Sequence, residues 1–556
     1  MNAPLRREAL AAPDLDAWLA ASQRKSLLRF ITCGSVDDGK STLIGRLLYD
    51  SRQLLDDQLA ALHADSRKSG TGALDLASLV DGLAAEREQG ITIDVAYRFF
   101  ATDRRKFIVA DTPGHEQYTR NMVTGASNAD LAVILIDARK GVLTQTRRHS
   151  YLVHLLGIRN LVLAINKMDL VGNDQDRFDS IIADYRAFAR EAGIGTFTAI
   201  PVSGLNGDNV ASRSAAMPWY RGPSLLEHLE TVSVAPRAAG QEPFAMAVQW
   251  VNRPNQNFRG YAGRVASGRI RVGAPIAVLP AGSRSSVARI VTFDGDRDEA
   301  VAGQSVTLVL ADDVDCSRGD VIADAETAPP STTRIESVLV WMSEEAMVPH
   351  RSYWLKIGTQ SVSATISGMG PVIDVNTMEQ RRGMTLALND IGQVEIDLDR
   401  RVPAVRYQDN RRLGGFILID KLTHATVAAG LVRDFAETVL RPGDNGGDEQ
   451  TRILWINGAT PDSVAAYAAA EAGRLKALGR PAFVLDESAL GGLAAGLEGA
   501  PAKAESIRHA REVAKLMSRA GVHVLVTVEA SEAEAHPGRR VDAGSPGEKG
   551  ADEWVI

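Results

Sequence analysis

Residues Gly34–Ser41, Gly-Ser-Val-Asp-Asp-Gly-Lys-Ser, decide the fold of the first part of this 556-residue chain. They fit the pattern Gly-x-x-x-x-Gly-Lys-Ser/Thr, in which a glycine-rich turn points successive backbone N–H groups at a phosphate chain. In this pattern Lys40 reaches the outer phosphates and the Ser41 hydroxyl binds a magnesium ion. An ordinary turn seldom matches the whole string by chance, so we predict a nucleoside triphosphate site. Its candidate binding residues are Gly34, Ser35, Val36, Asp37, Asp38, Gly39, Lys40, Ser41 and Thr42.

The flanks of this loop predict an α/β domain. Leu27–Cys33 has the pattern of a buried strand, and Ser41–Leu48 that of a helix whose positive N-terminal end faces the phosphates. From residue 27 to residue 232, apolar runs alternate with helical patterns, which indicates a mostly parallel sheet covered by helices on both faces. These runs are Lys106–Asp111, Leu131–Asp137, Asn160–Asn166 and Phe197–Ser203.

Composition favours an ordinary soluble protein of several domains, since 45% of the residues are hydrophobic and 24% are charged. Apolar runs such as Leu131–Ile136 are too short to cross a bilayer, and no secretory signal opens the chain. The net charge of −7 argues against an extended nucleic-acid surface. With only Cys33 and Cys316, a disulfide framework is not expected, and we predict a buried Cys33 thiol and a reducing cytoplasm.

The pattern changes after the first domain. Short alternating stretches separated by glycine, proline and aspartate turns predict two antiparallel β-barrels that divide near Glu326–Ser331. After a polar, glycine-rich linker, strand and helix patterns alternate again, with strands at Arg452–Ile456 and Val522–Val528 and a helix at Ser506–Arg519. The predicted segments are an N-terminal extension (1–26), the α/β domain (27–232), two barrels (240–326 and 331–433), a linker (434–450), a small α/β domain (451–530) and a disordered tail (531–556).

Further elements of the first domain indicate a nucleotide switch. Thr92 lies in a loop that could fold over the nucleotide and complete the magnesium shell. Asp111 ends an apolar strand and opens Asp-Thr-Pro-Gly-His, so its carboxylate could hold a magnesium-bound water, and the Gly114 N–H could sense the γ-phosphate. His115 is then placed to orient the attacking water, although by itself it would be an ordinary residue at the start of a helix.

The base is predicted to be guanine. Asn166-Lys-Met-Asp169 follows another apolar strand, and the Asp169 carboxylate can accept both N1–H and N2–H₂ of guanine, a donor pair that adenine lacks. Asn166 would support the loop and the base, while the stem of Lys167 would cover one face of the base. Ser203-Gly-Leu205, after the next strand, would bring a backbone N–H to the guanine O6. Ser203 carries the weakest of these motifs.

With these residues the chain resembles translational-type GTPases, in which a GTPase domain precedes two barrels, as in elongation factor Tu. Three stretches are more similar to the large, GTP-binding subunit of bacterial sulfate adenylyltransferase (ATP sulfurylase): Gly34–Leu48, Glu86–Asp94 and Asp111–Met122. Elongation factors typically carry histidine where Asp38 stands. The barrel ending Gly414–Asp420 is likewise similar to the sulfate-activating subunit, so the resemblance covers about residues 25 to 433.

The resemblance implies that a separate small subunit binds ATP and sulfate and makes adenylyl sulfate, while GTP hydrolysis on this chain drives that uphill step. It implies a heterodimer, Mg²⁺ as cofactor, and no nucleic-acid or membrane partner. We expect Lys40, Ser41, Thr92, Asp111 and His115 to carry hydrolysis, and Asn166 and Asp169 to carry base recognition. Coupling would be conformational, through loops around Thr92 and Asp111 that the γ-phosphate orders.

The C-terminal segment resembles an adenylyl-sulfate kinase, which is fused to this subunit in some members. The resemblance lies in Ala504–Val526 and in Val484–Asp486, and Arg508 matches a substrate-contacting arginine. In Gly458–Ala465, however, Val464 and Ala465 stand where a phosphate loop needs lysine and serine, so we expect a catalytically inactive remnant. Asp486-Glu-Ser488 also departs from the kinase pattern Asp-Gly-Asp, and the domain would serve in docking or regulation.

Two alternatives stay open. The first is a translation factor that delivers aminoacyl-tRNA, for which the arginines between residues 400 and 412 could be cited, although aspartates are interleaved with them. The second is a bifunctional enzyme whose C-terminal kinase domain is active, and Val464 is its main obstacle.

Overall fold

The computed structural model describes residues 25–51, 76–80, 92–234, 242–255, 258–375, 377–435, 453–458, 461–477, 482–486, 508–515, 517, 522–527 and 539–543. The chain divides into two compact units, Met1–Val439 and Leu440–Ile556, and each is considered by itself. Several predicted features lie outside the described residues: the N-terminal extension up to residue 24, residues 86–91 of the Glu86–Asp94 stretch, Glu487 with Ser488, and the linker from residue 436 onward.

The first domain is built on a six-stranded sheet in the order β2-β3-β1-β4-β5-β6. All neighbours are parallel except the edge strand β2, which runs antiparallel to β3. β4 and β5 are almost wholly buried, because helices cover both faces of a parallel sheet. The strands are β1 (Ser26–Cys33), β2 (Ala96–Ala101), β3 (Arg105–Asp111), β4 (Leu131–Asp137), β5 (Asn160–Asn166) and β6 (Phe197–Pro201).

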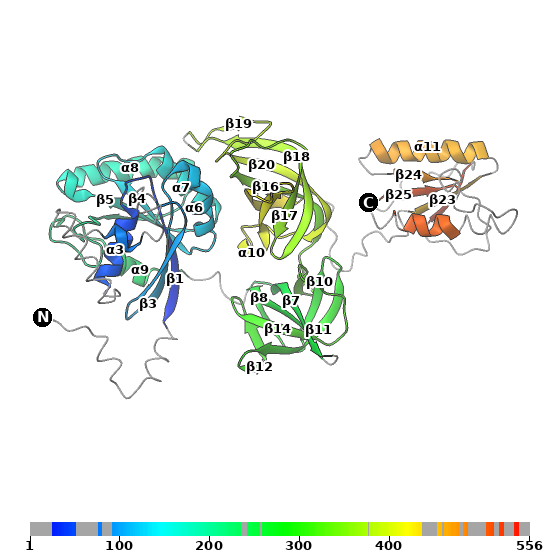
Figure 1. Ribbon diagram of the computed structural model, residues 1–556, viewed down its shortest axis with the longest axis horizontal. Helices are drawn as coiled ribbons and strands as arrows, with labels where there is room; N and C mark the ends of the chain where they lie inside the picture. Colours follow the sequence, from blue (N-terminus) through cyan, green and yellow to red (C-terminus); the bar gives the residue numbers. More distant parts are fainter. Residues whose placement is uncertain are drawn as a thin grey trace. The chain divides into compact units, whose positions relative to one another are not determined.

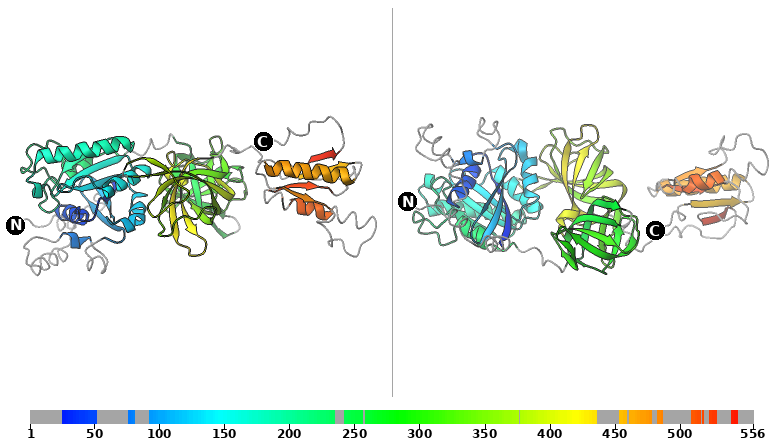
Figure 2. Two further views of the ribbon diagram at one scale, coloured as in Figure 1. Left: turned by 90° about the horizontal axis from the view of Figure 1, so that it is seen from above. Right: turned by 60° about the horizontal axis from the view of Figure 1, so that its bottom comes forward.

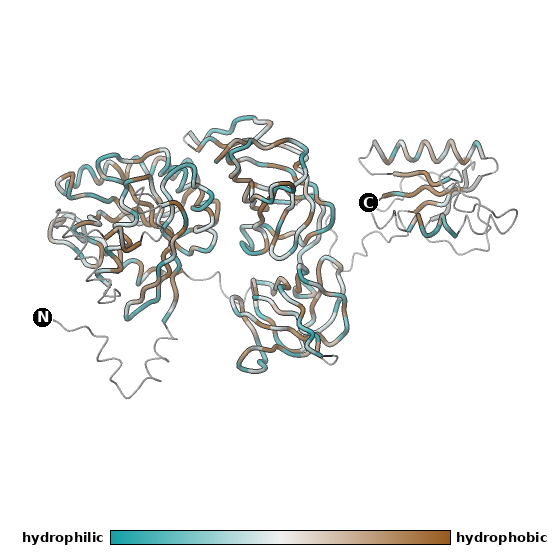
Figure 3. Tube along the Cα trace, viewed as in Figure 1, coloured by the Kyte–Doolittle hydropathy of each residue, from teal (hydrophilic) through white to brown (hydrophobic). Residues whose placement is uncertain are grey.

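Helices lie on both faces of this sheet, as the sequence predicts (Figures 1 and 2). On one face α3 (Lys40–Asp50) and α9 (Leu225–Thr231) pack over a core that includes Phe30, Val133 and Val162. On the other face the core includes Ile31, Ile134 and Leu163. That face is covered by α6 (Thr119–Ala126), α7 (Thr144–Leu155) and α8 (Gln175–Glu191). Figure 3 shows the central strands as hydrophobic segments, in keeping with this double cover.

The second domain is a closed antiparallel barrel, since pairing of β10 with β11 joins the sheet order β10-β15-β7-β8-β14-β11-β12 into a ring. β9 and β13 form a separate ribbon beside it. Its interior holds Met246, Tyr261 and Ile322. The strands are β7 (Ala245–Asn255), β8 (Phe258–Ser267), β9 (Arg269–Arg271), β10 (Pro275–Leu279), β11 (Ser283–Thr292), β12 (Gly295–Arg297), β13 (Glu299–Val301), β14 (Ser305–Leu310) and β15 (Val321–Asp324).

The third domain is a second barrel, in the order β17-β21-β22-β16-β20-β18-β19 with β17 paired to β18. Two antiparallel barrels are thus confirmed. The elements are β16 (Ser331–Trp341), β17 (Ser352–Ile357), β18 (Gln360–Ile373), β19 (Gln380–Arg382), β20 (Ile391–Pro403), α10 (Arg411–Gly414), β21 (Gly415–Asp420) and β22 (Thr426–Phe435).

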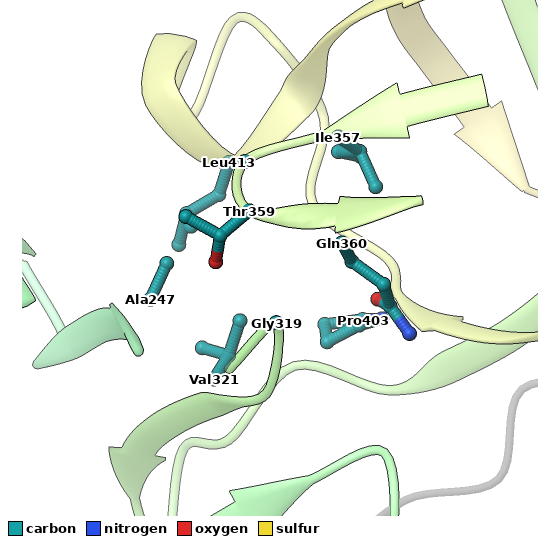
Figure 4. Close-up of a pocket in the computed structure, with 9 residues that line it drawn as sticks. Ala247, Gly319, Val321, Ile357, Thr359, Gln360, Pro403 and Leu413 are labelled. Atoms are coloured by element: carbon teal, nitrogen blue, oxygen red, sulfur yellow. The ribbon is translucent and has the colours of Figure 1, made fainter. Parts of the chain in front are cut away.

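Side chains from both barrels meet around a small apolar cavity of about 20 Å³ (Figure 4). The Thr359 hydroxyl of the second barrel donates a hydrogen bond of 2.8 Å to the Val248 carbonyl of the first. A space of this size holds about one water molecule, so the barrels are closely packed here. Its lining includes Ala247, Val321, Ile357 and Leu413.

The first domain also contacts the second barrel. The Tyr407 hydroxyl donates to the Leu156 carbonyl at the end of α7, at 3.1 Å. The Asn389 side-chain amide donates to the Glu116 carbonyl, also at 3.1 Å. Tyr407 and Leu156 share one buried cluster with residues of α7 and of the barrel. These contacts join the sheet domain to the second barrel, and one of them is made by Glu116, which directly follows the predicted site residue His115.

The second unit contains a parallel sheet in the order β24-β25-β23-β26. Its elements are β23 (Ile453–Gly458), α11 (Pro461–Ala477), β24 (Ala482–Leu485), β25 (His523–Val526) and β26 (Arg539–Ala543), with residues 508–515 helical. Val464, on α11, is 9% exposed and packs against Leu454, Ile456 and Leu525 of the sheet. Its side chain is therefore part of the core.

One expectation for this unit is corrected. We predicted disorder for residues 531–556, yet Arg539–Ala543 forms β26 and pairs in parallel with Leu454–Gly458 of β23. The stretch is too short and too charged to show as a strand in the sequence. At a sheet edge the backbone hydrogen bonds to β23 suffice to order it, because an edge strand needs few apolar side chains.

Among the described helices of the whole chain, none is long and apolar enough to cross a membrane.

Candidate functional site

The predicted phosphate loop joins β1 to α3 and borders a cavity of about 140 Å³. Two glycines allow its path. A Cβ on Gly39, which has φ 93°, would lie 2.5 Å from the Asn166 side-chain nitrogen, and Gly34 has φ 148°. Predicted site residues from several segments of the chain thus line one cavity. The lining residues are Val36, Asp37, Gly39, Lys40, Ser41, Thr42, Ala77, Thr92, Gly114 and His115.

Lys40 is the buried cation of this loop. Its ammonium donates to the Ser35 carbonyl at 2.8 Å and to the Gly34 carbonyl at 3.2 Å. Burial lowers its pKa, although the nearby Asp111 and Asp38 carboxylates oppose that change. A cation held among the backbone carbonyls of a glycine-containing loop suits a phosphate chain.

The three predicted magnesium ligands converge. The Ser41 hydroxyl donates to Asp111 Oδ2 at 2.7 Å and lies 3.4 Å from the Thr92 hydroxyl. Burial raises the pKa of Asp111, while Lys40 and the hydroxyls of Ser41 and Thr32 stabilise its ionised form. Oxygen donors of this kind are the ligands that Mg²⁺ prefers. The residues fit the ion: Ser41 and Thr92 would hold it, and Asp111 would hold one of its waters.

Gly114 and His115 also line the cavity. A Cβ on Gly114 would lie 2.5 Å from Lys40 Nζ and 2.8 Å from the Val36 amide nitrogen, so only glycine permits this approach. His115 is exposed, and its Nδ1 accepts from the Gln117 N–H at 3.3 Å. Nε2 is therefore the ring nitrogen that could hold a water. Both residues lie beside the phosphate loop, as their predicted roles require.

Asn166 ties the phosphate loop to the base loops. Its amide nitrogen donates to the Asp38 carbonyl at 2.8 Å, and its amide oxygen accepts from the Gly204 N–H at 2.9 Å. The side chain is buried between the two loops. These hydrogen bonds support the loops as predicted, and the contact of Asn166 with the base stays a prediction. Ser203, also buried, accepts from the Asn206 N–H at 3.2 Å and shapes the turn that contains Leu205.

Lys167 has φ 64°, and its ammonium lies 3.0 Å from Asp137 and contacts the Asp37 carbonyl. Asp137 also binds Arg139 at 2.6 Å. Burial opposes ionisation of Asp137, but the hydrogen bonds from Arg139 and Lys167 hold its pKa below the usual range. The carboxylate therefore fixes Lys167 across the base side of the phosphate loop. Asp169, half-buried in the short helix η3 (Met168–Val171), stands beside it.

Asp38 does not line the cavity. Its carboxylate points into the loop, where Oδ2 accepts from the Ser35 N–H at 2.6 Å. The side chain is 1% exposed, and burial raises its pKa to about 6. Asp38 therefore shapes the loop from inside, and in this structure its contribution to a ligand would be through its backbone.

Sequence reasoning missed three residues of this site. Ala77, in the short helix η1 (Ala77–Leu79), lines the cavity, and no motif marks it. Asp137 ends a buried strand just as Asp111 does, a signal that could have identified it. His149 belongs to no recognisable motif either, yet it lies completely buried against the phosphate loop. Cys33 is buried as predicted, and burial raises the pKa of its thiol to about 12.

Comparison with known families supports this reading of the fold. Residues 25–235 match the elongation factor Tu GTP binding domain, residues 261–323 match elongation factor Tu domain 2, and residues 334–433 match the GTP-eEF1A C-terminal domain-like family. The first domain is thus a P-loop GTPase domain of the elongation factor Tu type that binds GTP with Mg²⁺.

Solved structures of Sup35 also resemble the chain. Sup35 complexed with GMPPNP is 23% identical, with a TM-score of 0.35, and the match covers 78% of this chain and 99% of that one. Sup35 complexed with GDP is 24% identical, with the same TM-score, over 74% of this chain and 95% of that one.

Proposed function

Starting from an elongation-factor-Tu-like GTPase domain with two barrels, we propose that this chain is the GTPase subunit of a sulfate adenylyltransferase. A separate catalytic subunit binds ATP and sulfate and forms adenylyl sulfate and pyrophosphate. The observation that carries the proposal is the extended similarity of Gly34–Leu48, Asp111–Met122 and Gly414–Asp420 to the sulfate-activating subunit. Asp38, at a position where elongation factors typically have histidine, is part of that similarity.

The described residues supply the parts of a GTP-hydrolysing site. Lys40 neutralises the outer phosphates, and His115 holds the attacking water beside Gly114. Magnesium, when bound by Ser41 and Thr92, neutralises charge on the phosphates. The asparagine and aspartate of the base loop, Asn166 and Asp169, select guanine.

Coupling to the partner follows from the position of the switch residues. Thr92 and Gly114 both border the cavity, and Glu116, two residues after Gly114, accepts a hydrogen bond from Asn389 of the second barrel. Loss of the γ-phosphate would release the loops that contain them. The released energy would then reach the partner subunit as a change in the surface made by these loops and the barrel.

We propose that the C-terminal unit is an inactive relative of adenylyl-sulfate kinase. Val464 stands where a phosphate loop needs its lysine, and its side chain packs in the core between α11 and the sheet. No cation from this position can reach a phosphate, so phosphoryl transfer lacks its main electrostatic support. The unit is left with a role in docking or regulation.

A translation factor is the second candidate, because the matching family models come from elongation factors. Two of the five arginines between residues 400 and 412 that could serve RNA binding are paired with acids, which argues against it. Arg406 pairs with Asp434 at 2.9 Å, and Arg400 lies 3.7 Å from Asp399. A surface whose cations are paired with acids offers little to a phosphate backbone.

One experiment tests the proposal. The full chain is mixed with a bacterial sulfate adenylyltransferase small subunit, ATP, GTP and sulfate, and pyrophosphate, adenylyl sulfate, its 3′-phosphorylated product and GDP are measured. We expect adenylyl sulfate to accumulate beyond the level reached without GTP, and GTP turnover to rise when the small subunit and sulfate are both present. The chain with Lys40→Ala serves as the control that cannot couple.

The outcomes separate the candidates. GTP turnover that ignores both sulfate and the small subunit contradicts the sulfate role. Stimulation of GTP turnover by added ribosomes and aminoacyl-tRNA would favour the translation factor instead. A 3′-phosphorylated product without added kinase would show that the C-terminal unit is active.

A further inference from the structure

His149 is a completely buried imidazole that none of the predicted nucleotide motifs includes. It lies on α7, and its Nδ1 is 3.2 Å from the backbone nitrogen of Gly34 at the start of the phosphate loop. A backbone N–H can only donate, so Nδ1 must accept, and the neutral ring then carries its proton on Nε2. The geometry therefore fixes the tautomer of this histidine.

The partner of His149 is a residue that has no side chain to hold it in place. Gly34 has φ 148°, and a Cβ there would lie 2.8 Å from the Leu135 carbonyl oxygen and 2.9 Å from Asp38 Oδ2. Its carbonyl accepts from the Lys40 ammonium at 3.2 Å. His149 thus holds the N–H side of the same peptide segment whose carbonyl side contacts the phosphate-binding lysine.

The surroundings keep the ring neutral. Burial lowers the pKa of His149 to about 3, and the nearby positive charges of Lys40 and Arg148 act in the same direction. The Gln145 amide nitrogen lies 3.4 Å from Nε2; with the proton on Nε2 both atoms are donors, so this is a packing contact and not a hydrogen bond. A protonated ring would lose its acceptor and would repel Lys40, so the neutral form is the one that fits the loop.

We propose that His149 is a positioning residue of the GTP site: it fixes the first peptide of the phosphate loop through the Gly34 N–H. It does not touch the nucleotide. Without the acceptor nitrogen of His149, the Gly34 peptide is no longer fixed. The Gly34 carbonyl, which accepts from the Lys40 ammonium, is then less well positioned. Binding of GDP and of GTP then weakens alike, because both use the same loop, while turnover at saturating GTP is preserved. The inference concerns GTP binding and does not rest on the proposed sulfate role.

The test compares three variants of the full chain by the rate at which a fluorescent GDP analogue dissociates. His149→Leu removes the acceptor in a similar volume, and His149→Gln replaces it with an amide oxygen. Tyr185→Phe is the matched control, because it removes another buried contact of α7, the 3.0 Å hydrogen bond between Tyr185 and Ser150, and leaves the contact between His149 and Gly34 in place.

We expect His149→Leu to speed dissociation about tenfold and to raise the KM for GTP by a similar factor, with kcat unchanged. His149→Gln should stay within about threefold of the natural protein, since its oxygen can accept from Gly34. Tyr185→Phe should lower the melting temperature and leave dissociation as it was. His149→Met, with a flexible apolar side chain, repeats the test if His149→Leu does not fold.

Three results would overturn the inference: natural dissociation rates in folded His149→Leu, equal acceleration in His149→Leu and His149→Gln, or equal acceleration in Tyr185→Phe. The last result would mean that any loss of stability in α7 loosens the nucleotide. A fall in kcat with no change in KM would likewise contradict a role in loop positioning.

Discussion

Two strand-to-helix junctions of this chain have the same local design and different contents. In the first domain β1 leads through Gly34–Ser41 into α3, and Lys40 at the start of the helix faces a cavity. In the second unit β23 leads into α11, and Val464 near the start of that helix faces the sheet. A parallel sheet followed by a helix therefore makes a place for a phosphate, but only the loop and its lysine make a site.

The two junctions also differ in the kind of groups that they bury. Around Lys40 the structure buries charges and pairs them with carbonyls and carboxylates. Around Val464 it buries apolar side chains such as Ile456 and Ala468. The first arrangement favours ligand binding, and the second favours stability. Four predictions test this contrast, from the largest expected effect to the smallest.

Lys40→Ala should lower single-turnover GTP hydrolysis by about 10²–10³-fold, because the site loses the cation that stabilises charge on the phosphates. Rapid-quench measurement of GDP formation checks this. Lys356→Ala, which removes an exposed lysine of β17, is the control and should leave hydrolysis unchanged. Equal loss in both variants would mean that general charge matters and the loop does not.

Val464→Lys should not create a kinase, and it should destabilise the second unit by about 3 kcal/mol or more, because the new ammonium would be buried among apolar side chains. Urea unfolding of the full chain and an adenylyl-sulfate kinase assay measure the two effects. A stable variant that phosphorylates adenylyl sulfate would show that the junction needed only its lysine.

The first unit should lose stability as the pH falls, through His149. Its folded pKa of about 3 lies below the usual 6.5, so the unfolded chain takes up this proton first and unfolding is favoured between these two values. From pH 7 to pH 5 the contribution amounts to about 2 kcal/mol. Asp38 opposes it, because its raised pKa of about 6 makes the folded state bind the proton first.

The measurement isolates the histidine by comparing urea unfolding of the natural protein and of His149→Gln at pH 7 and at pH 5. The His149→Gln variant keeps the contribution of Asp38 to the pH dependence of stability and lacks the contribution of the histidine. The natural protein should therefore lose more stability than the variant, and identical losses would contradict the assignment.

Gly473→Ala should stabilise the second unit by about 0.5–1 kcal/mol, because this exposed glycine of α11 has open space around its Cα and alanine is the better helix former. Thermal unfolding of the full chain checks it. In the first domain, by contrast, Gly114→Ala should impair GTP binding, since its Cβ would meet Lys40 and Val36. No gain in the melting temperature would mean that α11 is constrained at this position.

The sequence predicted the sheet domain well where runs are apolar and end at polar residues. β4 and β5 begin and end at the predicted residues, because buried parallel strands are continuously hydrophobic. In the barrels the ends of the strands do not follow from hydrophobicity alone. β7 continues to Asn255 through exposed polar residues, since pairing with β8 orders them and hydrophobicity does not. β26 could not be predicted for the same reason.

The nucleotide site was predictable to the extent that its residues form contiguous motifs. Ser41, Thr92 and Asp111 lie far apart in the sequence, yet each belongs to a string of known chemistry, and the structure brings them together. His149 belongs to no such string. It lies 115 residues from Gly34, and only folding of α7 against β1 reveals the contact. Residues that support a site from behind carry no local signal.

Helix α7 meets two partners that have nothing else in common. His149 holds the phosphate loop, and Leu156, seven residues later and about two turns along the helix, accepts from Tyr407 of the second barrel. Both contacts depend on one helical register. An insertion or deletion between the two residues would rotate one contact away by about 100° per residue, so neither could adapt separately. During evolution, the segment between His149 and Leu156 should therefore tolerate substitutions but not insertions or deletions.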